Sequence, residues 1–160
     1  MPYEVAIPAI ETAVRALLVA NGSVVSQLAS KPTSRGGGPA IYADGDVPLG
    51  ATFPYLTMGA WTQIGSHNLS PGSPGGGYGW NCTGQIKAVG QLSSTKNETT
   101  LLNLMSAVFA ALPQGKGLSV SGYGSGWIDE FVLQPSLKTT LAGVVTIEVP
   151  AILRLYVHDV

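Results

Sequence analysis

The side chains best suited to catalysis or metal binding are few and scattered. The 160 residues include only two histidines, His67 and His158, and one cysteine, Cys82. A transition-metal site needs several His, Cys or carboxylate ligands that converge, and these three residues share no recognised spacing. A nucleophile needs a neighbouring base, whereas Cys82 falls on the apolar side of an expected strand, as a buried structural thiol would. We therefore predict no catalytic residue, no metal and no cofactor.

Two short motifs could bind an ion but are more typical of turns. Asp44-Gly45-Asp46 is too short for an EF-hand calcium loop, and its composition favours a turn. "GYGSGW", Gly122 to Trp127, has alternating glycines. It does not lead into a helix, whose N-terminus a phosphate-binding loop requires. We interpret it as a hairpin bend.

The three tryptophans could form a platform for a sugar or a base. Trp80 alternates with apolar residues and is expected in the core. Trp61 alternates to the face opposite the apolar residues of its strand, so it is the tryptophan predicted to make a contact. A carbohydrate-binding module that uses Trp61 is therefore one possible class of function.

The composition gives few charges. Apolar residues make up 45% of the chain and charged residues 11%, against about 25% charged in an average protein. The net charge of −1 predicts no basic patch for nucleic acid. The single cysteine fits a reducing compartment, and no signal peptide or membrane-length apolar run is evident. A surface of low charge is easily desolvated in contacts with other chains, although an ordinary soluble protein with a neutral surface remains an equal alternative.

Apolar spacing and end signals predict two main helices. A helix over 8–20 has apolar residues at the i, i+4, i+7 and i+8 spacing of one buried face and stops at Asn21-Gly22. A short helical piece over 23–29 follows, with Ser23 as its cap. The capping-box pattern from Thr95 to Glu98 predicts a second main helix that ends near Leu112.

Alternating apolar residues predict strands over 55–65, 80–92, 126–133 and 143–158. In the first of these, Leu56, Met58, Ala60 and Ile64 are expected to share one face. The last strand has seven apolar residues in unbroken alternation, from Val145 to Val157. Pro150, which lacks a backbone N–H, is expected at an edge or a bulge.

These elements predict an α+β fold in a single domain, 1–160. Its antiparallel or mixed sheet has about four main strands and packs against two main helices. Glycine- and proline-rich segments predict flexible loops near 30–39 and 66–79.

The order of these elements resembles the tail-completion, or tail-terminator, family of long-tailed bacteriophages. The likeness spans most of the chain and rests on five segments in order. They are the helix end "LLVANGSVVSQLAS", the stretch "AIYADGDVPLGATFPYLTMG", the strand "NCTGQIKAVGQ", the helix "ETTLLNLMSAVFAAL" and the strand "TIEVPAILRLYVHD". In the second of these segments, members of the family tend to have an Ile-Tyr pair, then a turn that contains proline, then a strand that starts with Pro-Tyr.

The resemblance implies a non-enzymatic virion protein at the head-proximal end of the tail, assembled in the host cytoplasm. It would form a homo-hexameric ring that caps the tail tube and offers a surface for head–tail joining. Its partners would be further copies of itself, the tail tube protein and the head-completion or connector protein. DNA would be only passing cargo, and no membrane is involved. Six-fold closure requires heterologous contacts, in which one patch meets a different patch on the neighbour.

Five residues are the predicted contacts with a neighbouring subunit or the tube: Asp44, Asp46, Trp61, His67 and Tyr78. The alternative functions are another phage neck or tail-tube structural protein and, after it, the carbohydrate-binding module; an enzyme comes last.

Overall fold

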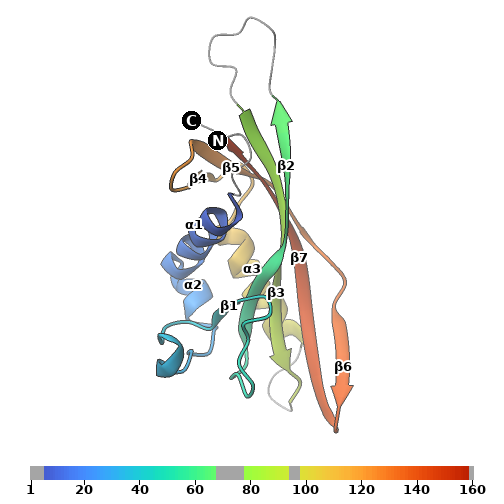
Figure 1. Cartoon of the computed structure of the whole chain (residues 1–160). Helices are drawn as coiled ribbons and strands as arrows, with labels where there is room; N and C mark the ends of the chain where they lie inside the picture. Colours follow the sequence, from blue (N-terminus) through green and yellow to red (C-terminus); the bar gives the residue numbers. More distant parts are fainter. Residues whose placement is uncertain (1–5, 68–77, 94–97, 159–160) are drawn as a thin grey trace, which may run out of the picture.

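The helices form one layer against one face of a twisted sheet, as Figure 1 shows. The computed structural model describes residues 6–67, 78–93 and 98–158. The helices are α1 (Ile7–Ala20), α2 (Gly22–Val25) and α3 (Glu98–Ala111), with a 3-10 turn at Thr33–Arg35. The two main helices therefore lie where they were predicted, and the beginning of the capping box lies outside the described residues. No helix in the described part of the chain is long and apolar enough to cross a membrane.

The sheet has seven strands and is mixed. They are β1 (Ile41–Ala43), β2 (Tyr55–His67), β3 (Tyr78–Gln91), β4 (Gly117–Ser119), β5 (Ser125–Leu133), β6 (Leu137–Leu141) and β7 (Val144–His158). Their order is β1-β2-β3-β7-β5-β4, and β6 also pairs with β7. Among the described strands, only β1 and β2 pair in parallel. The α+β class is confirmed, but the prediction of about four strands was too low because β1, β4 and β6 have three to five residues each.

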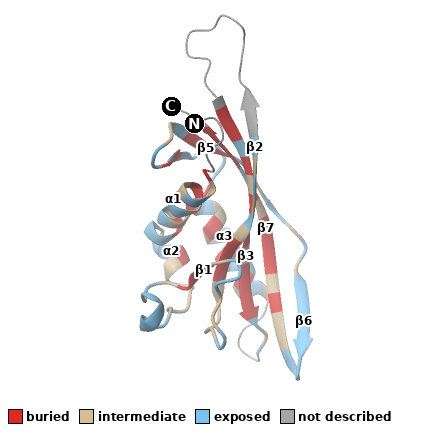
Figure 2. Ribbon diagram, viewed as in Figure 1, coloured by how far each residue is buried: buried red, intermediate tan, exposed pale blue. Residues whose placement is uncertain are grey.

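The core lies between the helices and the alternating face of β7. Leu153 is fully buried there, with the neighbouring odd-numbered apolar residues of the strand. From α3, Leu104, Met105 and Val108 are buried in the same cluster. Figure 2 shows the buried residues along β3 and β7 and on the sheet-facing sides of the helices. The alternation in the sequence thus identified the face that carries the core.

Pro150 lies in a central strand, at a local break in its pairing: residues 134–136 stand opposite Val149 and Pro150, between the β5 and β6 ladders. Its carbonyl oxygen accepts a hydrogen bond from the backbone N–H of Gln134 at 2.8 Å. In an antiparallel ladder the N–H and C=O of one residue point to the same side. The missing N–H of Pro150 therefore faces residues 134–136, where β5 has ended and β6 has not begun. No ladder bond is lost.

A bulge in β2 reverses the predicted faces of its second half. The pairing with β3 shifts between Gly59 and Thr62, and Ala60 takes a left-handed φ of 52°. The extra residue moves each later side chain to the other face. Ile64, predicted in the core, is consequently 67% exposed.

Two connections also differ from the prediction. The cap of α2 is Asn21, whose Oδ1 accepts the backbone N–H of Val24 at 3.1 Å, and not Ser23. The 66–79 loop is shorter than predicted, because β2 continues to His67 and β3 begins at Tyr78; residues 68–77 lie outside the described part. The 30–39 loop is closed by the bridge between Ser30 and Pro39, and its flexibility stays a prediction.

Candidate functional site

Asp44 begins the turn that follows β1. Its side chain packs on the face of the sheet that is opposite the helices. Its backbone N–H donates to the Met58 carbonyl at 2.7 Å. A Cβ on Gly59 would overlap the Asp44 side chain, so only glycine fits beneath it. Lys87 Nζ lies 4.0 Å from a carboxylate oxygen of Asp44 and 3.8 Å from a carboxylate oxygen of Glu148. Ion pairs this exposed stabilise a fold by at most about 1 kcal/mol, so the close packing on Gly59 is the stronger restraint on Asp44.

Asp46 borders a hollow that is rich in cationic groups. Arg15, Lys31 and Arg35 line the same hollow of about 170 Å³. The Arg15 guanidinium donates to the Ile41 carbonyl at 2.6 Å, which ties α1 to the outer edge of β1. The hollow contains three cations and one carboxylate, so its chemistry suits an anionic side chain.

Trp61 does not lie on the face that the sequence predicted. The β2 bulge turns it toward the helices, where a Cβ on Gly84 would overlap its ring. Its indole N–H donates to the Glu11 carboxylate of α1 at 3.1 Å. Trp61 is therefore a half-buried link between β2 and α1, and it offers no open platform for a sugar. Its predicted part in a subunit contact stays a prediction.

His67 and Tyr78 are paired residues of the β2–β3 ladder. The prediction that His67 sits in a flexible loop was wrong for its backbone, which belongs to β2. The side chains of both residues lie outside the described part of the chain. Their roles in a subunit or tube contact stay predictions.

Cys82 is a buried thiol, as the alternation of its strand predicted. It is 1% exposed, and desolvation raises its pKa to about 11. The thiolate is the nucleophilic form of cysteine, and it is scarce near neutral pH in this environment. Cys82 accordingly serves as an apolar core residue.

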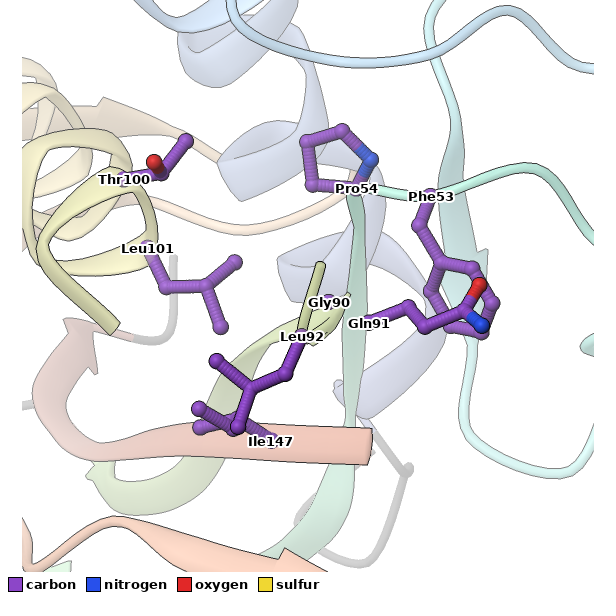
Figure 3. A pocket seen from close by; sticks show the side chains of 8 residues that line it. All are labelled: Phe53, Pro54, Gly90, Gln91, Leu92, Thr100, Leu101 and Ile147. Carbon is purple, nitrogen blue, oxygen red and sulfur yellow. The ribbon is translucent and has the colours of Figure 1, made fainter. Parts of the chain in front are cut away.

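An apolar hollow lies where the segment before β2 meets β3, β7 and α3 (Figure 3). Pro54, Gly90, Leu101 and Ile147 are among its lining residues. Its volume is about 10 Å³, about enough for a single water molecule. It can hold no substrate.

Within the described residues no three His, Cys, Asp or Glu side chains gather in a way that could hold a metal ion. The prediction that the protein is not an enzyme stays a prediction.

The exposed strand β6 was not predicted from the sequence. All five residues of β6 are exposed, including Leu137 and Leu141, and Figure 2 shows the strand in a single colour along its length. The alternation of Leu137, Thr139 and Leu141 before the turn at Ala142-Gly143 was the available signal. It is only five residues long and carries polar residues typical of a loop.

A shallow groove between α1 and β4 is also uncharged. It has a volume of about 390 Å³. The residues that line it are Pro8, Ala9, Thr12, Ala13 and Ala16 of α1 with Ser119 and Ser121. The small side chains of α1 leave this surface open between the helix and the sheet.

The α+β fold has a counterpart in a virus-like particle. A chain in the solved structure "Virion of native gene transfer agent (GTA) particle" is 18% identical to this chain, with a TM-score of 0.63. The alignment covers 96% of this chain and 98% of that chain. A second solved structure aligns over 96% of each chain at 12% identity, with a TM-score of only 0.49. No protein-family profile and no curated protein matches the chain.

Proposed function

We propose that the chain is a structural protein of a phage-like virion. The observation that carries this proposal is the fold, shared from end to end with a chain of the gene transfer agent virion. The two chains have nearly the same extent, so the likeness concerns the whole architecture rather than one recurring motif. The low content of charged residues further supports a protein that works through contacts with other chains.

Within the virion, we propose the role of a tail terminator. The protein forms a hexameric ring that caps the tail tube at its final length and then presents a surface to the head-completion or connector protein. The order of the five quoted sequence segments supports this role. The partners are further copies of the chain, the tail tube protein and the connector, and DNA passes through the ring. The location is the head-proximal end of the tail.

A ring of this kind uses the chain as a scaffold and not as a catalyst. Asp44, Asp46, Trp61, His67 and Tyr78 are proposed to support subunit or tube contacts. For Trp61 the geometry favours an indirect role in these contacts, because its hydrogen bond to Glu11 holds α1 on the sheet. Asp46 is better placed for direct contact, because it is an exposed residue that lines the cationic hollow.

Deleting the gene tests the terminator role. Without a cap the tube has no stop and the head has no surface to join, so electron microscopy should show overlong or unjoined tails. Normal tails attached to heads would contradict the proposal. A complete absence of tubes would instead indicate the tail-tube class, and supplying the protein in trans should restore tail length and joining.

A further inference from the structure

Exposed apolar side chains are frequent in the β6–β7 hairpin and in the end of β5 that precedes it. Five of the ten large hydrophobic residues that are exposed in the described part lie between residues 132 and 144. They are Val132, Leu133, Leu137, Leu141 and Val144. Apolar patches of this kind are typical of protein–protein contact sites.

The β6–β7 hairpin presents an apolar ridge on one face. Leu137 and Leu141 share a face because strand residues alternate, and Leu141 pairs with Val144 across the turn. Lys138, on the opposite face, points toward the helices, where its Nζ lies 3.7 Å from a Glu98 carboxylate oxygen of α3. The one charge of β6 is therefore directed away from the ridge, which we define as Leu137, Leu141 and Val144.

The outer edge of β6 lacks the protection that β1 has. At β1 the Ile41 carbonyl accepts from Arg15, and the Ala43 carbonyl accepts from the backbone N–H of Asp46. Among the described strands β6 pairs with β7 alone. Natural proteins commonly guard such edges with charges, bulges or a covering segment. β6 has only its short length and Lys138 for this purpose. The apolar ridge on its face is therefore the surface left open to a partner.

The α1–β4 groove is a complementary surface on another part of the molecule. Ala13 and Ala16 of α1 face it together with Ser119, and none of its lining residues is charged. In Figure 1 the groove elements α1 and β4 lie at the upper left and the β6–β7 hairpin projects at the lower right. The ridge and the groove of one chain therefore cannot meet each other.

We propose that the ridge of one copy docks in the α1–β4 groove of a second copy. The ridge residues and the groove lining are uncharged, and Glu148, which lies beside Leu137, is paired with Lys87 at 3.8 Å, so docking desolvates no unpaired ion. The contact is heterologous, which means that each copy has one ridge and one groove to offer. Repeating the contact around a closed ring covers every ridge and every groove. The inference deepens the proposed function and rests on it only for closure of the contact into six copies.

Sedimentation of the purified full chain with two surface variants tests the docking. Leu141→Asp places a carboxylate on the ridge at a residue that is 79% exposed. Ala16→Glu places one in the groove at an exposed position of α1. Wild-type protein should self-associate, and each variant should weaken association by at least about tenfold, since the new carboxylate is buried without a partner. The control Ile64→Asp changes an apolar residue that is 67% exposed, away from the ridge and the groove, and should assemble like wild type.

Mixing the two variants gives the decisive result. The Ala16→Glu chain keeps its ridge and the Leu141→Asp chain keeps its groove, so the mixture should form dimers of one to one composition. Each variant alone should stay monomeric with an unchanged melting temperature. Wild type that sediments as a monomer, or variants that assemble as wild type does, would overturn the docking. Normal assembly by Ala16→Glu alone would show that the ridge meets a different surface.

These outcomes are separable from a failure of the proposed function. Rings that persist in both variants would remove the docking but leave the terminator role standing. Normal tails after gene deletion would remove the terminator role, while the one to one dimers would still establish the contact.

Discussion

The contact between Trp61 and Gly84 is the sharpest test of how β2 is built. Gly84→Ala introduces a methyl group that overlaps the Trp61 ring. Overpacking of this kind costs about 1–3 kcal/mol in other proteins. In a Trp61→Ala background the overlap is gone, and alanine is favoured over glycine within a strand by about 0.5–1 kcal/mol. The same substitution should there be neutral or stabilising, so the coupling between the two positions should be about 2 kcal/mol or more.

Urea denaturation followed by circular dichroism would measure the four proteins of this cycle. A loss of 1 kcal/mol lowers the melting temperature of a chain this size by about 2–4 °C, so thermal melts provide a second readout. Trp61→Phe is the matched control, because it removes the hydrogen bond to Glu11 and keeps an aromatic ring over Gly84. If Gly84→Ala costs the same with and without Trp61, the ring does not cover Gly84 and the bulge at Ala60 is misplaced.

Two further predictions concern residues that are buried in the core. Leu153→Asp puts an unpaired carboxylate in the fully buried centre of β7, a cost of several kcal/mol against a total stability of about 5–15 kcal/mol; the variant should lose cooperative unfolding, and a normal melt would contradict the burial. Burial raises the pKa of Cys82 from 9.0 to about 11, so between these values the unfolded chain loses a thiol proton that the folded chain keeps. As the pH rises through this window, the free energy of unfolding should therefore fall by up to about 3 kcal/mol more in wild type than in Cys82→Ala. Urea titrations at several pH values measure it, and an equal pH dependence in the two proteins would refute the burial of the thiol.

The elements with long, regular patterns could be predicted from the sequence. The alternation from Val145 to Val157 identified β7 and its buried face, and the helical spacing identified α1. The β7 pattern repeats over thirteen residues and the helical pattern over two turns, from Ile10 to Leu18, so one irregular position does not disturb them. The burial of Trp80 and Cys82 was predicted in the same way, from the alternation of apolar residues in β3.

Features set by tertiary pairing could not be predicted. The bulge at Ala60 depends on the pairing of β2 with β3 and leaves no clear mark in the sequence, so the faces of Trp61 and Ile64 were assigned wrongly. The parallel strand β1 is only three residues long and owes its place to β2 and Arg15. Likewise, the alternation of Leu137, Thr139 and Leu141 is too short to show that this side of β6 is exposed, which becomes clear only from its pairing with β7.

Locating the chain in assembled particles tests the central claim most directly. Cryo-electron microscopy of particles made with an epitope-tagged chain should place six copies in a ring where the tail meets the head. Particles without the chain, or copies repeated along the whole tube, would contradict the proposed terminator role.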